Sequence, residues 1–414
     1  MRARVRAGLL AARLLALAGC GDGSARATSG IELLVAAGDS TYWIAADTDG
    51  TAGARMRAAP LLLARWDGRL YEVYAADDDR SYYDAVFTSQ RVFRRDLLRG
   101  DSLAVFDDPR VGTLADRYAV ANPYERPLAP EEDAAEEPAT VATSEVTLLD
   151  VFGPYLTVEH RADVESRGDA HEHRLRRSVV DLRTGRRASL DELFDARTAA
   201  ALTADGRRRF AAAVDSVRQL ADGEPRDAAA QALRALRSLR FDATSFGLTS
   251  VDAGPAVVFV ALGSDAEGRA VSLALAPLPA PAPLWWRRDV ARTLPRWRPD
   301  SSEARVPLGR AAELVARPVA GGGTRLALRV PGARRAVPLG DVGAPVHQVL
   351  PLSRAVLSDS ARRALRRAFD ESAFYGDVTT SVSWRPGVAP RVAPRVAPRV
   401  ASPSLARHTS AASH

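Results

Sequence analysis

The chain has 414 residues, of which 46% are hydrophobic, so its length allows two or three domains with a large buried core. Lysine is absent and asparagine occurs once, at Asn122, while arginine and alanine abound; this pattern is typical of a GC-rich genome. Four arginines precede the only cysteine, Cys20, and four more follow residue 386, and setting these eight charges aside turns the net charge of +6 into −2. The net charge of the chain without these eight arginines is so close to zero that nucleic acid is not expected as a partner, despite a pI of about 9.8.

The first twenty residues, MRARVRAGLLAARLLALAGC, have the pattern of a targeting segment. A basic start precedes an apolar run at 7–17, which is too short to span a bilayer as a mature helix. Leu17-Ala18-Gly19-Cys20 resembles the lipobox of bacterial lipoproteins. The resemblance implies a signal peptide at 1–19 and acylation of Cys20. It also implies an extracytoplasmic protein of the cell envelope, anchored to a lipid membrane. The alternative is an ordinary signal peptide with a chance cysteine.

A polar tether at 20–30 is followed by a stretch, 31–126, whose short apolar runs predict an antiparallel β-rich domain. A hairpin is expected at Asp67-Gly68, because this dipeptide tolerates the positive φ angles of tight turns. Further strands are expected at 84–93 and 102–108, and a short helix at 111–120. The Pro- and Glu-rich stretch 127–143 has no apolar period and predicts a solvated linker.

The pattern at 144–278 predicts an α+β domain. Two or three strands end at a turn at Thr184-Gly185, and Ser189 and Glu192 match a capping box. A long helix is expected to end near Gly223, before a further helix at 227–239 and strands at 245–263 and 269–277.

This order of elements carries a resemblance over residues 144–277. A hairpin with Ala170-His171, a strand ending VVDLRTG, then SLDELF, a long helix and FGLTSVDAGPAVVFV resemble one known domain. It is the extracytoplasmic domain of lysozyme-sensing anti-sigma factors, also attached to some peptidoglycan deacetylases. Gly168-Asp169 stands where that family usually has Gly-Gly. The resemblance implies an envelope domain that binds a partner, with lysozyme among the candidates, and it transfers no catalytic site.

The rest of the chain predicts a Pro- and Trp-rich connector at 279–300, a small α+β segment at 301–385 and a disordered tail at 386–414. In the small segment a helix after Ser358 would present Leu365 and Phe369 on one face and arginines on the other. That basic face is either solvated or in contact with anionic lipid. The tail repeats a four-residue unit with proline, which opposes helix and sheet. The whole chain is therefore expected to be α+β.

Ser40, in the sequence LLVAAGDS, resembles the nucleophile block of GDSL-type hydrolases. Such a serine needs a histidine base and oxyanion donors. No D-x-x-H occurs in the chain, and residues 41–43 read as a strand rather than as the helix that follows a nucleophile elbow. We therefore expect Gly38-Asp39 to form a hairpin turn and Ser40 to be catalytically silent.

Two candidate ligand sites remain. His160, Asp163, His171 and His173 would come from neighbouring strands and offer imidazole and carboxylate groups to a metal; the alternative is a polar hairpin whose histidines titrate in water. Asp77, Asp79 and Tyr82 are candidate polar contacts for a ligand, although their stretch lacks the spacing of a calcium loop.

No cofactor is expected, and no complete catalytic set is found in the sequence. The favoured hypothesis is a non-enzymatic lipoprotein that binds or senses an envelope protein or a cell-wall ligand. The alternative is an envelope hydrolase that acts on a glycan or an ester.

Overall fold

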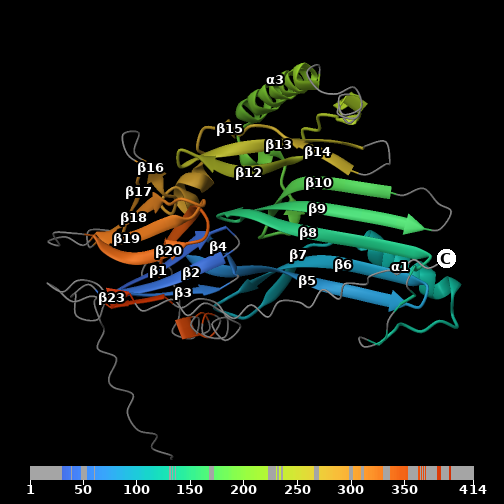
Figure 1. The fold of residues 1–414 in the computed structure, drawn as a ribbon, viewed down its shortest axis with the longest axis horizontal. Helices are drawn as coiled ribbons and strands as arrows, with labels where there is room; N and C mark the ends of the chain where they lie inside the picture. Colours follow the sequence, from blue (N-terminus) through green and yellow to red (C-terminus); the bar gives the residue numbers. More distant parts are fainter. Residues whose placement is uncertain are drawn as a thin grey trace, which may run out of the picture.

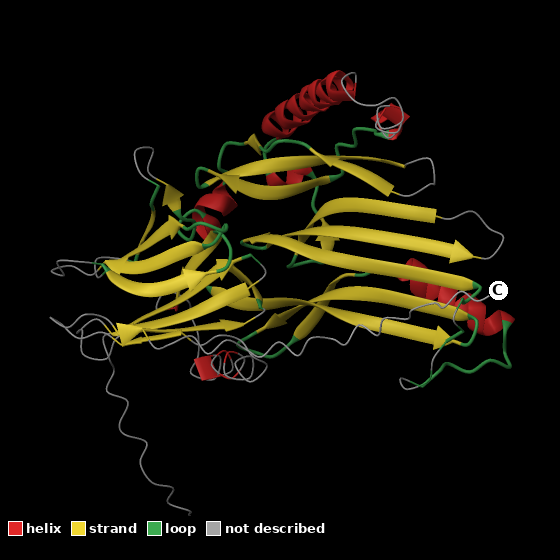
Figure 2. Ribbon diagram, in the orientation of Figure 1, coloured by secondary structure: helices red, strands yellow, loops and turns green. Residues whose placement is uncertain are grey.

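The computed structural model describes most of the chain between residues 30 and 392 as an α+β protein dominated by β-sheets (Figures 1 and 2). The described residues are 30–38, 40–47, 54–59, 61–129, 132, 134–135, 137–166, 172–221, 230, 233–234, 236–264, 270–297, 302–308, 312–329, 336–352, 362–363, 365, 367, 369, 380–383 and 391–392. The expected signal peptide, Cys20, His171 and nearly all of the C-terminal tail lie outside them.

The first sheet joins strands from both ends of the chain, in the order β21-β1-β2-β3-β22-β23. Strand β1 lies between β2 and β21 and is hydrogen-bonded antiparallel to both. The bounds are β1 Gly30–Ala37, β2 Ser40–Asp47, β3 Ala54–Ala59, β21 Val346–Pro351, β22 Thr380–Ser383 and β23 Arg391–Val392.

The second sheet is the largest and has the order β11-β10-β9-β8-β6-β5-β4, with β7 also paired to β6. Its long strands run side by side across the right half of Figure 1. The bounds are β4 Leu62–Trp66, β5 Arg69–Tyr82, β6 Ala85–Asp96, β7 Ser102–Phe106, β8 Thr140–Phe152, β9 Tyr155–Ser166, β10 Glu172–Asp181 and β11 Arg186–Arg187.

Two smaller sheets complete the β structure. One comprises β12 (Phe246–Val251), β13 (Gly254–Ser264), β14 (Ala270–Ala274) and β15 (Leu278–Pro279). The other comprises β16 (Arg296–Trp297), β17 (Ala304–Pro307), β18 (Glu313–Pro318), β19 (Thr324–Arg329) and β20 (Val337–Val342).

The two longer helices of the described residues lie on the outside of these sheets. Helix α1 (Pro109–Ala121) packs against β6 and β8, where Val111 and Ala115 are buried with Phe87. Helix α3 (Ala196–Ala221) lies beside β13 and β15 at the top of Figure 1. Two short pieces, α2 (Leu190–Leu193) and the π-helical turn η1 (Trp286–Val290), fill the space between the second sheet and β12–β13. In the described part of the chain no helix has the length and apolar character needed to cross a membrane.

Several local predictions are confirmed. The hairpin at Gly38 pairs Ala37 with Ser40, and Gly38 has a φ of +62°. The turn at Asp67-Gly68 joins β4 to β5, with positive φ at both residues. The predicted helix at 111–120 is α1, and the carboxylate of Glu192 accepts a hydrogen bond from the backbone N–H of Ser189 at 2.8 Å, as in the expected capping box.

The long-range pairing departs from the expected domain boundaries. The apolar residues of β1–β3 share one core with those of β17–β21, so the first three strands and the strands at 304–351 form a single sandwich. Across the expected linker, residues 85–89 of β6 pair with 140–144 of β8, and they do so in parallel. Alternating apolar residues show which face of a strand is buried, but not which strand lies next to it.

Parts of the expected connector and of the expected tail are also more ordered than their composition indicated. In the connector, Trp286 is fully buried and packs on Phe152, which makes it part of the central core. In the tail, Arg391 and Val392 form the short strand β23 beside β22.

Candidate functional site

Ser40 lies in the hairpin between β1 and β2, and no nucleophile elbow is formed there. It is the first residue of β2, so the chain leaves the serine as a strand rather than as a helix. The side chain therefore lacks the strand-to-helix geometry in which hydrolases of that kind hold their nucleophile.

A different serine, Ser144, lies within hydrogen-bonding distance of a histidine. Its Oγ is 2.8 Å from Nε2 of His160, and the same Nε2 is 3.3 Å from Oδ2 of Asp108. In a catalytic triad the serine and the carboxylate contact opposite nitrogens of the imidazole, so that one proton can move while the ring stays oriented. Here both contact one nitrogen, and among the described residues no carboxylate contacts Nδ1.

The same cluster is closed to solvent. The exposed fractions are 0% for Ser144, 4% for His160 and 9% for Asp108. Asp108 is also the N-cap of α1, and its carboxylate accepts hydrogen bonds from the Arg110 side chain at 2.9 and 3.0 Å. A buried polar group must find a partner, and these contacts satisfy each one. The arrangement fixes α1 against the sheet and offers a substrate no access.

The electrostatics of the cluster favour an uncharged histidine beside a charged carboxylate. Burial lowers the pKa of His160, against the opposing effect of Asp108. Burial alone would raise the pKa of Asp108, but hydrogen bonds from Arg110 outweigh it and the pKa is lowered. Arg110 therefore contributes most to keeping Asp108 charged, and His160 adds a smaller effect in the same direction.

The structure separates His160 from the other described metal candidates. Along β9, His160 and Asp163 are three residues apart and so point to opposite faces of the sheet. Asp163 instead faces His173 across the strands, with Oδ1 2.5 Å from Nδ1. His171 lies outside the described residues. Within those residues no three His, Cys, Asp or Glu side chains are grouped as a metal site.

The predicted polar contacts are likewise separated. Asp77 and Asp79 are exposed on β5, whereas Tyr82 is buried against α1 with its ring 5.1 Å from that of Tyr118. Asp77 accepts a hydrogen bond from Gln90 at 2.9 Å. All three residues lie on one 14-residue strand, whose alternation divides their side chains between two faces.

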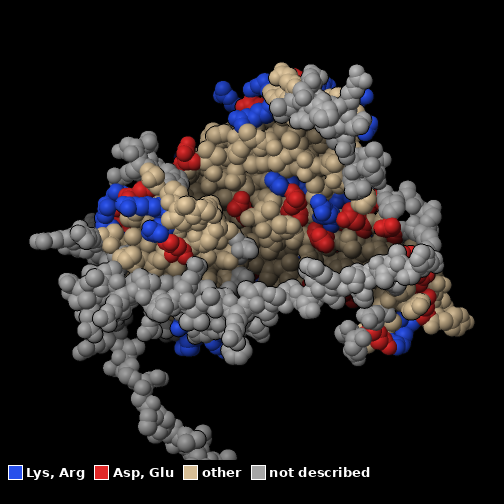
Figure 3. Space-filling view, viewed as in Figure 1, with Lys and Arg blue, Asp and Glu red and all other residues tan. Residues whose placement is uncertain are grey.

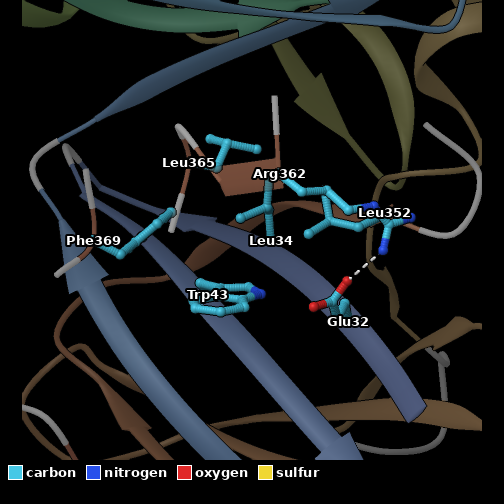
Figure 4. A pocket seen from close by; sticks show the side chains of 7 residues that line it. All are labelled: Glu32, Leu34, Trp43, Leu352, Arg362, Leu365 and Phe369. Carbon is cyan, nitrogen blue, oxygen red and sulfur yellow. Dashed lines mark hydrogen bonds and ion pairs between the residues drawn. The ribbon is translucent and has the colours of Figure 1, made fainter. Parts of the chain in front are cut away.

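One hollow lies between β1–β2 and the helical residues near 365 (Figure 4). Its walls are mostly apolar, and Arg362 closes one side through an ion pair with Glu32, at 2.9 Å. Leu365 and Phe369 are buried there beside Trp43, while Arg363 and Arg367 are exposed. Burial of Leu365 and Phe369 confirms the predicted apolar face, whereas Arg362, predicted on the opposite face, lines the hollow with them. The empty volume of the hollow, about 220 Å³, is a gap within a packed interface.

A second, larger hollow contains three arginines and opens at the edge of the second sheet. We call it the arginine pocket, and its empty volume, open to solvent, is about 630 Å³. It is formed by the end of β9–β10, the turn that follows, strand β11 and the start of α2. The lining residues are Tyr155, Asp181, Arg183, Thr184, Arg186, Arg187, Ala188 and Glu192.

The three arginines of the pocket differ in their partners. Arg183 is held by Asp181 at 2.8 and 2.9 Å and by the hydroxyl of Tyr155 at 3.0 Å. Arg186 and Arg187 have no ion pair with any carboxylate of the described residues. The guanidinium of Arg187 lies 5.8 Å from the centre of the Phe106 ring. A hollow nearby at Asp67 contrasts with this one, because its Arg288 is paired with both Asp67 and Asp289.

From the sequence, only the turn at Thr184-Gly185 was predicted in this region, and no pocket. The stretch DLRTGRR places three arginines within five residues around the predicted Thr184-Gly185 turn, and this local density was the available signal. Elsewhere the charges do not form one field, since basic and acidic side chains are interspersed on the face shown in Figure 3. Searches of protein-family models and of curated proteins find no match to this chain.

Proposed function

We propose that the protein is a lipid-anchored, non-enzymatic binding protein of the bacterial cell envelope. The arginine pocket is the observation that supports binding, because it combines a solvent-open hollow with two guanidinium groups that form no ion pair with a described carboxylate. The lipobox-like sequence ending at Cys20 supports the membrane anchor. All residues that line the pocket fall between 144 and 278, the stretch that resembles extracytoplasmic sensor domains.

In this proposal acyl chains on Cys20 hold the protein at a membrane, and the polar tether to residue 30 separates the folded part from the lipid surface. Each buried CH₂ stabilises such an anchor by about 0.8 kcal/mol, so two or more chains give stable attachment. The division into a central binding domain and a sandwich of both chain ends belongs to the same proposal.

The alternative of an envelope hydrolase finds little support in the described residues. Its nearest approach to a catalytic group is Ser144 with His160, and that pair is buried and has the carboxylate on the wrong nitrogen. A nucleophilic serine must be reached by its substrate and by a correctly oriented base.

Lipidation is tested by metabolic labelling of cells with an alkyne analogue of palmitate. The wild-type protein should be labelled and recovered with the membrane fraction, and Cys20→Ser should abolish both the label and the membrane retention. Ser24→Ala is the matched control, since it alters the tether and keeps the thiol. Label that persists in Cys20→Ser would exclude the proposed anchor.

A further inference from the structure

The arginine pocket indicates a chemical class of ligand, and this inference rests on the binding function proposed above. We propose that the pocket binds an oxyanion of the phosphate type, with Arg186 and Arg187 as its principal donors. Planar guanidinium groups pair with phosphate oxygens through two parallel hydrogen bonds each, and a phosphate has enough oxygens to meet two of them at once.

The third arginine has a structural part in this site. Arg183 donates to both carboxylate oxygens of Asp181, and its guanidinium lies 5.3 Å from the centre of the Tyr155 ring. Tyr155 is itself packed edge-on against Trp285, with ring centres 4.7 Å apart. Arg183 is therefore a fixed part of the wall, and its charge is already balanced by Asp181.

The acidic residues of the pocket are occupied, which leaves Arg186 and Arg187 for a ligand. Asp181 is engaged by Arg183, and Glu192 accepts the backbone N–H of Ser189 at the start of α2. Strand β11, which carries Arg186 and Arg187, is the last strand of its sheet. Among the described residues no further strand covers its outer edge, and both arginines line the open hollow.

The positive charges around Arg187 also favour an anionic ligand. Burial and the nearby positive charge of Arg176 lower the pKa of Arg187, and Arg110 acts in the same direction. Asp108 is the opposing carboxylate, but it already accepts several hydrogen bonds from Arg110. A doubly charged anion beside Arg187 would relieve this repulsion, whereas an uncharged ligand would leave it unchanged.

The test uses the full chain with Cys20→Ser, so that acylation cannot cause membrane binding. Equilibrium dialysis with radiolabelled inorganic phosphate should show saturable binding at one site per chain. Arg186→Gln and Arg187→Gln should each weaken binding about tenfold or more, as expected for the loss of a charge-assisted hydrogen bond. Arg207→Gln is the control, because it removes an exposed arginine from α3, outside the pocket. Thermal unfolding checks that every variant is folded.

A second measurement separates the two sources of phosphate. Phosphatidylcholine vesicles with and without phosphatidic acid are sedimented with the same proteins. Binding to phosphatidic acid that is lost in Arg187→Gln would assign the site to a lipid headgroup, whereas binding of free phosphate alone would assign it to a soluble ligand. Absence of binding in both assays, or equal weakening by Arg207→Gln, would overturn the inference. Since both assays use the non-acylated chain, neither result bears on the anchor at Cys20.

Discussion

Two half-buried titratable groups are expected to give the protein opposite pH dependences that nearly cancel. Burial raises the pKa of Asp150 to about 6, against the effect of Arg177, and burial lowers the pKa of His347 to about 4. Asp150 lies on β8 at the point where its register with β9 shifts, and His347 lies on β21. Each is a group whose charged form the folded state disfavours.

The two effects have opposite signs. Between pH 3.8 and about 6 the unfolded state has released the Asp150 proton and the folded state has kept it, so stability falls as the pH rises. Between about pH 4 and 6.5 the unfolded state binds a proton at His347 and the folded state does not, so stability falls as the pH falls. At 1.36 kcal/mol per pKa unit each contribution amounts to about 3 kcal/mol.

Single substitutions should separate the two slopes. Asp150→Asn keeps the shape of the side chain but cannot ionise. The difference in free energy of unfolding, variant minus wild type, should therefore be about 3 kcal/mol larger at pH 7 than at pH 4. In a domain of this size the difference corresponds to about 6 °C in Tm. His347→Gln should show the reverse trend, with its relative stability rising as the pH falls.

Thermal unfolding followed by circular dichroism, in steps from pH 4 to 7.5, gives the difference curves directly. Any constant offset from altered packing leaves their slopes unaffected. Asp101→Asn, in the exposed turn before β7, controls for the loss of a carboxylate in general. Flat difference curves for both Asp150→Asn and His347→Gln would refute the reasoning, because desolvation would then not dominate at either site.

Three further outcomes follow from the buried cluster and from packing. A fluorophosphonate probe should leave Ser144 unmodified, because its exposed fraction is 0%; stoichiometric labelling that Ser144→Ala removes, detected by mass spectrometry, would restore the hydrolase alternative. Phe369→Ala should cost about 3–5 kcal/mol in urea unfolding, since Phe369 is fully buried, whereas exposed Arg367→Ala should change stability by less than about 0.5 kcal/mol. Gly112→Ala, in α1 with open space around it, should stabilise by about 0.5–1 kcal/mol. Gly263→Ala should destabilise by about 1–3 kcal/mol, because its Cβ would lie 2.7 Å from the Ser238 carbonyl carbon; equal effects of the two glycine substitutions in the same unfolding assay would contradict this.

Local sequence signals predicted local structure well. Glycine at position 38 and the Asp67-Gly68 pair mark turns because they tolerate positive φ, and the structure has hairpins at both. The apolar face formed by Leu365 and Phe369 was likewise visible from helical spacing alone. In each case the residues that decide the conformation lie within a few positions of one another.

Pairing between distant strands was not predicted. Val35 pairs with Val349, and Val86 of β6 pairs in parallel with Val141 of β8. Nothing in the sequence around either residue identifies its partner strand. Backbone hydrogen bonds are the same for every residue type apart from proline, so the pattern of apolar residues leaves the neighbour of a strand undetermined.

The candidate sites show the same limit, with one exception. The arginine pocket forms where a turn, an edge strand and α2 meet. No single stretch of the sequence predicts that meeting. By contrast, the odd spacing of His160 and Asp163 already placed them on opposite faces of any strand, and this alone argued against a shared metal. Tyr82 and Asp77 are also an odd number of positions apart along β5, so their side chains lie on opposite faces of that strand.

The position of β1 between β2 and β21 has a consequence for biosynthesis. Val35 is made early, but its partner Val349 follows only after most of the chain, which at 5–20 residues per second takes roughly 15–60 s. During that interval one edge of an apolar strand has no native neighbour and is open to aberrant association. Nascent chains that stop short of β21 should therefore depend on holding chaperones, and the first strand synthesised would be among the last to reach its final partners.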